Sequence, residues 1–143
     1  MEPISPLDPE EQLGYLLARV ADQIGRDWSA ALREEGINPR QFSMLAWLAR
    51  EPGLGQAELA RRVLMTPQSA SESVAALLKA GLVGRKSGGA GLKAEVRLTR
   101  TGRALLRRAY PIVEATNRRG FRALTTQERT NLARLLQKVL RGG

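Results

Sequence analysis

Two residue types on which protein chemistry often depends are absent from this chain of 143 residues, which contains no cysteine and no histidine. Without cysteine there is no disulfide, no thiolate nucleophile and no cysteine-based redox sensor. Without histidine as well, the usual ligand sets for zinc are missing. We therefore expect neither a metalloenzyme nor a thiol switch, and we expect no metal ion or other cofactor.

Aromatic residues and long apolar runs are also scarce. Phe, Trp and Tyr together make up 4% of the chain, and no uncharged apolar run approaches the roughly 18 residues that a membrane span requires. Residues 1–11 are acidic and contain proline, whereas a secretory signal begins with a basic region that leads into an apolar one. We expect a single-domain protein with a real core, located in the cytoplasm and without membrane contact.

The charge is strongly positive and unevenly distributed. The chain has 23 basic and 14 acidic residues, a net charge of +9. Residues 1–60 hold ten acids and five bases, whereas residues 61–143 hold four acids and eighteen bases. An excess of bases favours a polyanionic partner, either nucleic acid or an anionic membrane surface. The asymmetry indicates that the two halves meet different surroundings or complement each other.

Capping patterns divide the chain into helices. Asp8-Pro9, Asn38-Pro39 and Thr66-Pro67 each place a capping residue before a proline at the first helical position, and Thr125 to Glu128 forms a capping box. Apolar residues follow each cap at helical spacing. The helices predicted from these patterns are 9–35, 39–50, 55–63, 67–80, 100–122 and 126–140, with Gly36 and Gly81 as stops.

Between the fourth and fifth of these helices the pattern is that of a β-hairpin. Residues 82–86 and 93–98 flank the glycine-rich segment 87–91. The preceding helices, 55–63 and 67–80, are about three residues apart and fit a helix-turn-helix. A helix-turn-helix followed directly by a hairpin is a winged-helix module, so we predict a mainly α fold of six helices with a small β-hairpin wing.

Four segments, taken in order, resemble the MarR-type (multiple-antibiotic-resistance regulator) family of bacterial transcription factors: residues 56–63 (QAELARRV), 65–69 (MTPQS), 80–83 (AGLV) and 97–102 (RLTRTG). The resemblance implies a homodimer that reads palindromic operator DNA, represses transcription, and releases the DNA when a small aromatic or anionic effector binds. It further implies dimerisation helices in 1–35 and 100–143 and a DNA-binding lobe in 37–99, with the helix-turn-helix at about 55–81 and the wing at about 82–99.

The second helix of the helix-turn-helix contains no Lys or Arg before Lys79. Gln68 is able to pair with adenine, and Glu72 with the amino group of cytosine. Serines at 69 and 71 either contact DNA or are ordinary solvated helix residues. The DNA-binding candidates are Thr66, Pro67, Gln68, Ser69, Ser71, Glu72, Arg85, Lys86, Lys93 and Arg97.

Two departures from the family pattern stand out. Members of the family frequently carry Arg at the position of Glu72, and an Asp and an Arg near the tip of the wing. Here the tip reads GGAGLK, and Lys93 is the nearest substitute for that Arg. Lysine lacks the planar fork of arginine, which suits a narrow groove. Phosphate contacts from the hairpin are therefore expected to supply much of the affinity.

Effector candidates are the few large side chains on elements that flank the cleft of that family: Trp28, Met44, Trp47 and Tyr110. Aromatic residues at helical spacing are also common in cores, so both roles remain open. Several arginines of the fifth helix are expected to pair, within the dimer region, with Asp22, Asp27, Glu34 and Glu35.

Other functions have less support. The serines have no base partner at a recognisable spacing, and the glycine-rich loop lies on a hairpin rather than between a strand and a helix, so we expect no catalytic residues and no enzyme. A nonspecific architectural DNA-binding protein is the main alternative, because the second helix of the motif is poor in bases. An RNA-associated helical module is a further alternative.

Overall fold

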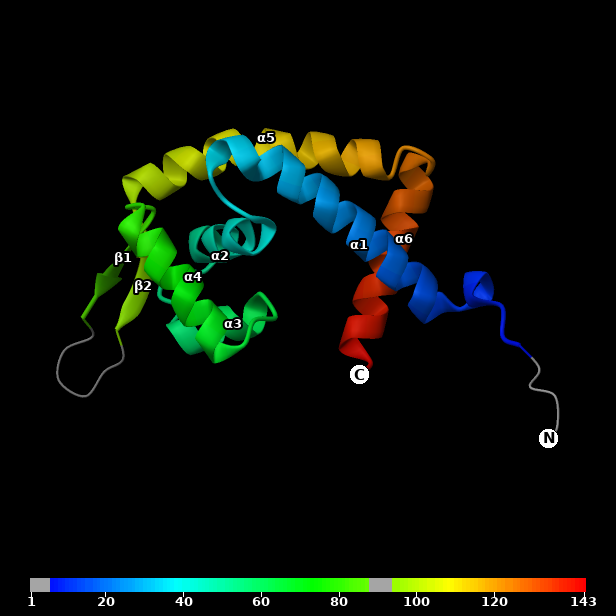
Figure 1. Ribbon diagram of the computed structural model, residues 1–143, viewed down its shortest axis with the longest axis horizontal. Helices are drawn as coiled ribbons and strands as arrows, with labels where there is room; N and C mark the ends of the chain where they lie inside the picture. The colour runs from blue at the N-terminus through cyan, green and yellow to red at the C-terminus, as the bar shows by residue number, and fades with distance from the viewer. Residues whose placement is uncertain (1–5, 88–93) are drawn as a thin grey trace. The chain divides into compact units, whose positions relative to one another are not determined.

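The computed structural model describes residues 6–87 and 94–143. Within them lie six α-helices, two 3₁₀ turns and one two-stranded hairpin (Figure 1). The helices are α1 (Leu13–Leu32), α2 (Pro39–Arg50), α3 (Gln56–Arg62), α4 (Pro67–Lys79), α5 (Arg100–Gly120) and α6 (Thr126–Arg141), and the strands are β1 (Val83–Lys86) and β2 (Glu95–Leu98). This arrangement confirms the predicted fold class.

The chain divides into two compact units. One, which we call the lobe, is Trp28–Val113; the other, the terminal unit, combines the chain up to Asp27 with Glu114–Gly143. The lobe therefore holds α2, α3, α4 and the hairpin. Helices α1 and α5 each begin in one unit and end in the other.

Three of the predicted caps form as expected. Asn38 and Gln41 make a reciprocal capping box at the start of α2, in which the Asn38 Oδ1 accepts from the Gln41 N–H at 2.8 Å. The Thr66 hydroxyl accepts from the Ser69 N–H at 3.1 Å and opens α4. Thr125 and Glu128 form the box that opens α6. Each cap satisfies backbone N–H groups that the first helical turn leaves without partners.

The prediction for the first helix is wrong at both ends. Asp8 does cap a helical segment, but the segment is the 3₁₀ turn Pro9–Glu11, and α1 begins only at Leu13. The break occurs because the Gln12 N–H bonds to the Pro9 carbonyl and the Gln12 backbone is extended, with ψ at 118°. At the other end a second 3₁₀ turn, Arg33–Glu35, follows α1 and stops at Gly36.

A single apolar core holds the lobe together. The buried side chains come from every helix of the lobe and from both strands: Leu32, Ile37, Phe42, Met44, Leu45, Leu48, Leu59, Ala60, Ala70, Val74, Leu77, Leu82, Val83, Val96, Leu105, Leu106, Ala109 and Val113. The inward face of α4 is formed by Ala70, Val74 and Leu77, as the helical spacing predicts. The opposite face of α4 is left exposed, and this exposed face is the surface predicted to read DNA.

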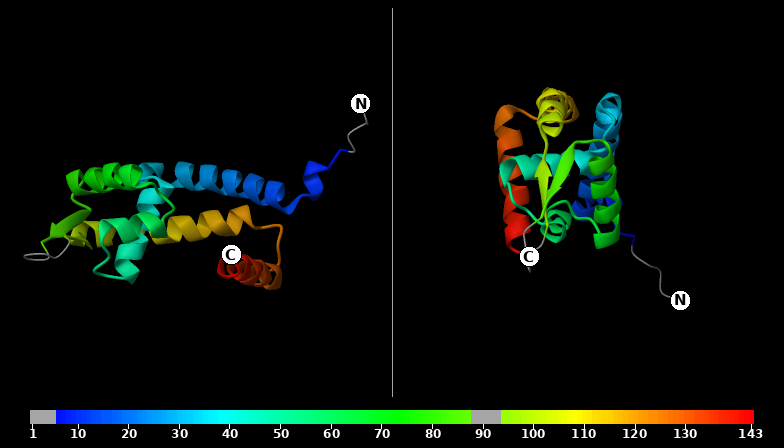
Figure 2. Two further views of the ribbon diagram at one scale, coloured as in Figure 1. Left: turned by 90° about the horizontal axis from the view of Figure 1, so that it is seen from below. Right: turned by 90° about the vertical axis from the view of Figure 1, so that its left-hand side faces the viewer.

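The two strands form an antiparallel hairpin (Figure 2, right). Its register is defined by the pairs Val83 with Leu98 and Lys86 with Glu95. Its second strand also contacts the segment before α3. Glu95 forms an isolated bridge with Gly55, and the Val96 N–H reaches the Leu54 carbonyl at 3.4 Å. The wing is thus attached to the start of the helix-turn-helix as well as to its end.

The hairpin joins α5 through a tight junction that explains the Leu-Thr-x-x-Gly pattern of residues 98–102. The Thr99 hydroxyl donates to the Gly81 carbonyl at 2.6 Å and accepts from the Gly102 N–H at 3.0 Å. A Cβ at Gly102 would lie 2.1 Å from the Leu82 carbonyl oxygen and 2.7 Å from a methyl group of Leu98. Only glycine fits there, because real Cβ atoms do not approach other atoms so closely.

The terminal unit differs from the lobe in what it leaves exposed. Large apolar side chains lie on α1 and α6 with much of their surface open, for example Leu13 at 84%, Val139 at 71% and Leu140 at 82%. The other exposed members on these two helices are Tyr15, Leu16, Leu17, Val20, Leu135 and Leu136, and Leu7, ahead of α1, is exposed as well. Both helices are therefore amphipathic, and the structure of one chain does not cover their apolar faces. None of the described helices is long and apolar enough to traverse a bilayer.

Candidate nucleic-acid interface

The structure places most of the predicted DNA-reading residues on the exposed surface of α4. Thr66, Pro67, Gln68, Ser71 and Glu72 are exposed, whereas Ser69 is half-buried. The Thr66 hydroxyl oxygen already accepts the capping hydrogen bond, so its own O–H is the group left to donate. The first two turns of α4 thus present hydroxyl, amide and carboxylate groups side by side.

The charge on this surface is as low as the sequence indicates. In α4 the basic residue is Lys79, which lies in the last turn. Glu72 is exposed, and within the described residues the structure shows no ion pair for it. An unpaired carboxylate beside DNA repels phosphate, but it accepts a hydrogen bond well from an amino group of a base.

Two of the predicted wing cations already have protein partners. The Arg85 guanidinium donates to the Gln56 side-chain oxygen at 2.9 Å, which links β1 to the first turn of α3. Arg97 is paired with Glu95 of the same strand at 3.1 Å. Lys86 is exposed at the end of β1. Lys93 lies outside the described residues. A guanidinium has five N–H donors, so Arg85 is able to keep Gln56 and still contact a phosphate.

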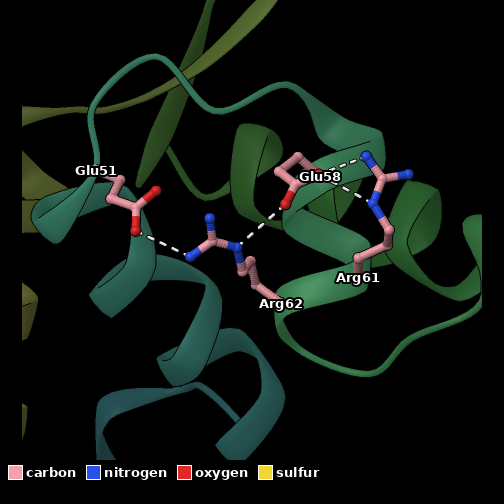
Figure 3. Close-up of polar contacts among 4 residues, drawn as sticks. All are labelled: Glu51, Glu58, Arg61 and Arg62. Carbon is pink, nitrogen blue, oxygen red and sulfur yellow. Dashed lines mark hydrogen bonds and ion pairs between the residues drawn. The ribbon is translucent and has the colours of Figure 1, made fainter. Parts of the chain in front are cut away.

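An ion-pair chain joins α2 to α3 (Figure 3). Arg62 donates to Glu51 at 2.9 Å and to Glu58 at 3.1 Å, and Glu58 also pairs with Arg61. The hydrogen bond from Arg61 and, to a smaller extent, the one from Arg62 lower the pKa of Glu58 below its usual value. The same contacts, first from Glu58 and then from Glu51, raise the pKa of Arg62. This chain of contacts helps to fix the first helix of the helix-turn-helix on the lobe.

Trp47 is one of the effector candidates for which a core role also remained open, and two arginines contact its ring. Its ring lies 4.6 Å from the Arg62 guanidinium and 5.4 Å from that of Arg50, measured to the ring centroid. Both distances are typical of cation–π contacts. The indole is therefore half-buried next to the Glu51–Arg62 ion pair, and in this arrangement it supports the position of α3.

The remaining effector candidates separate into one buried residue and an aromatic group. Met44 is completely buried in the core and presents no surface to a ligand in this structure. Trp28 and Tyr110 are partly exposed, and both contact Phe42 edge-to-face, with ring centroids 5.6 and 5.9 Å apart. Phe42 connects the two rings, and the sequence analysis did not select it because it reads simply as a core residue of α2.

One of the predicted ion pairs between the fifth helix and the N-terminal acids forms. Arg108 contacts Glu35 at 3.0 Å inside the lobe, although the two residues are 73 positions apart. Asp22 instead pairs with Arg26 one turn further along α1, at 2.8 Å. Within the one described chain, Arg108–Glu35 is the pair of this set that the structure shows, and the pairs expected within the dimer region stay a prediction.

Two short helices joined by a turn, an exposed second helix, and a hairpin fixed to both define the lobe as a winged helix-turn-helix module. A sequence profile of the MarR family matches residues 35–91. The HTH-type transcriptional repressor Rv2887 of Mycobacterium tuberculosis is 37% identical over 134 residues, which are 93% of this chain and 96% of the relative. The chain belongs to the MarR family of transcriptional regulators.

Solved structures agree with this assignment. The crystal structure of Rv2887 in complex with DNA is 36% identical, has a TM-score of 0.75, and covers 90% of this chain and 97% of the other. The crystal structure of Rv2887 with salicylic acid is 37% identical in sequence and has a TM-score of 0.75. The match covers 90% of this chain and 96% of the other. A MarR-family regulator from Rhodococcus sp. RHA1 reaches a TM-score of 0.88 at 24% identity, with coverage of 94% and 96%, and supports the fold alone.

Proposed function

We propose that this chain is a ligand-responsive regulator that represses transcription by binding a palindromic DNA duplex as a homodimer. The observation that carries this proposal is the exposed polar start of α4 in a winged helix-turn-helix, together with the relative of 36% identity that was solved with DNA. Its activity is binding rather than catalysis, and it takes place in the cytoplasm, where bacterial DNA is accessible.

The uncovered apolar faces of α1 and α6 support the dimer. These faces expose large apolar side chains to water, and a second copy of the chain offers the same faces in return. We therefore assign dimerisation to residues 1–35 and 100–143 and DNA binding to residues 37–99. Two-fold symmetry in the protein matches a palindrome whose half-sites lie about one helical turn apart.

The competing function is nonspecific DNA association, which the low charge of α4 favours. A direct comparison separates the two. The full-length protein is titrated by fluorescence anisotropy against a labelled duplex from the region upstream of its own gene and against the same bases in scrambled order. We expect the upstream duplex to bind at least about 100-fold more tightly, with an affinity that falls steeply with salt. Equal affinities would establish the nonspecific function and reject the repressor.

An aromatic acid is the proposed class of effector. Rv2887 was solved with salicylic acid, and in this chain the partly exposed Trp28 and Tyr110 both contact the buried ring of Phe42. Salicylate titrated into the protein–DNA complex should release the labelled duplex. Tyr110→Ala should raise the salicylate concentration needed while leaving DNA affinity alone. Release at the same concentration by the variant would place the effector elsewhere.

A further inference from the structure

Helices α3 and α4 end in the same hydrogen-bonded motif. The residue with the left-handed backbone in this motif is Leu64 after α3 and Gly81 after α4. At the end of α4 the Leu82 N–H bonds to the Leu77 carbonyl and the Gly81 N–H to that of Leu78, both at 3.0 Å. At the end of α3 the Met65 N–H bonds to the Ala60 carbonyl at 3.0 Å, and the Leu64 N–H to that of Arg61 at 3.3 Å. Both ends are therefore Schellman caps.

The key position of this cap requires a left-handed backbone, which glycine adopts without strain. Gly81 occupies it with φ at +73°, but at the end of α3 the residue is Leu64, with φ at +55°. Leu64 is the non-glycine residue with positive φ in the described chain. A bulky side chain in this conformation is disfavoured, and a residue held in such a conformation suggests a functional role.

Packing within the chain does not explain the leucine. Val63 and Met65, on either side, pack against the core, whereas Leu64 is 86% exposed. Most of the other exposed large apolar residues lie in the terminal unit; in the described part of the lobe, Leu64 shares this property with Tyr110. Leu64 is thus separate in the chain from the apolar faces proposed for dimerisation.

The position of Leu64 in the helix-turn-helix indicates that its partner is DNA. Leu64 precedes Thr66, the N-cap of α4, by two residues, and in a docked helix-turn-helix the start of the second helix meets the base edges. Apolar side chains read the methyl group of thymine in the major groove. We propose that Leu64 makes an apolar contact with the DNA duplex, on a thymine methyl group in each half-site. This inference rests on the proposed function, in which α4 reads DNA.

The test compares the full-length protein with Leu64→Ala, Leu64→Gly and the matched cap variant Gly81→Ala on the upstream duplex. We expect both Leu64 variants to weaken DNA binding about fivefold for each half-site, because the loss of one apolar contact changes the affinity by about this factor. The melting temperature should rise or stay unchanged in Leu64→Gly, which relieves the left-handed backbone. Gly81→Ala adds strain in open space, so it should lower the melting temperature and leave DNA affinity unchanged.

Replacing thymine by deoxyuridine in the duplex removes the methyl groups and identifies the atom contacted. On the deoxyuridine duplex the wild-type protein should lose as much affinity as the Leu64 variants lose on the thymine duplex. Leu64→Ala should lose less affinity than the wild-type protein when thymine is replaced by deoxyuridine. If the wild-type protein binds the deoxyuridine duplex as tightly as the thymine duplex, the proposed contact with a thymine methyl group is overturned. Wild-type affinity in both Leu64 variants would overturn the proposal while leaving the repressor function intact. Failure of the wild-type protein to prefer the upstream duplex over scrambled DNA would overturn the function itself.

Discussion

The lobe and the terminal unit bury their apolar residues to very different extents. All the buried hydrophobic residues of the described chain lie in the lobe, whereas the terminal unit contributes one buried residue, Thr116. Both units consist largely of amphipathic helices, so the helical pattern alone does not distinguish them. The lobe closes its core within one chain, whereas the terminal unit leaves apolar faces open, which is the arrangement that the proposed dimer requires.

The largest expected effect comes from disrupting the uncovered faces. Val139→Asp places a charge on the apolar side of α6, at a residue that is 71% exposed and thus not needed to fold the protomer. It should convert the dimer into monomers and weaken operator binding by about 100-fold or more, because each lobe then binds alone. Analytical ultracentrifugation and anisotropy measure the two effects. Gln137→Asp, on the other side of the same helix, serves as the control and should remain a dimer.

The second prediction contrasts one leucine from each unit. Leu59 is completely buried in the lobe, and Leu59→Ala should reduce the free energy of unfolding by about 3 kcal/mol. Leu140 is 82% exposed; in the monomeric Val139→Asp background, Leu140→Ala should change the free energy of unfolding by less than about 0.5 kcal/mol. Urea denaturation measures both. Similar losses from both leucines would show that α6 packs within its own protomer.

The third prediction concerns close packing at the junction of the hairpin with α5. Gly102→Ala should destabilise the protein by about 2–3 kcal/mol, because the new methyl group overlaps the Leu82 carbonyl. Gly14, in the terminal unit, has no atom within 4 Å of an added Cβ. Gly14→Ala should therefore be neutral or stabilising by about 0.5 kcal/mol. Thermal unfolding measures both variants, and a lower melting temperature for Gly14→Ala than for Gly102→Ala would contradict this interpretation.

The smallest effect is electrostatic and depends on pH. Because Arg61 and Arg62 lower the pKa of Glu58 in the folded state, the ionised carboxylate stabilises the fold above the pKa of glutamate in unfolded chains, about 4.3. That contribution disappears as the pH falls through the lowered folded-state pKa. Glu58→Gln should therefore melt slightly below wild type at pH 7, and this difference in melting temperature should shrink as the pH falls below about 4.3. Glu72→Gln, which removes a carboxylate without an ion pair in the described chain, is the control and should melt together with wild type at pH 7.

Much of the fold could be predicted from the sequence because its determinants are local. Asn38, Thr66 and Thr125 each bond to an N–H group three residues ahead, and a glycine ends α4 with a left-handed turn. The order of helices and hairpin follows from these local features, and the resemblance to the family rests on the four sequence segments between residues 56 and 102. The start of the first helix was predicted wrongly because a short 3₁₀ turn uses the same Asp-Pro cap as an α-helix.

The candidate site was predicted less completely. The spacing of Glu58, Arg61 and Arg62 on one short helix was visible in the sequence, but the pairing of Arg62 with Glu51 was not. Nor did the sequence indicate that Arg50 and Arg62 both stack on Trp47, or that Arg85 is held by Gln56, 29 residues away. The exposed, left-handed Leu64 was also missed, since a turn between two helices does not reveal its backbone angles.

The sequence by itself determined the helices, their caps, the hairpin, the low charge of α4, and the absence of cysteine and histidine chemistry. These properties depend on residue type or on contacts within three or four positions. Only the tertiary structure decided which charges are already paired, as with Arg108 and Glu35, and which apolar faces remain open. Such pairs join elements far apart in the chain, and their geometry is set by how the helices pack around the core rather than by any local pattern.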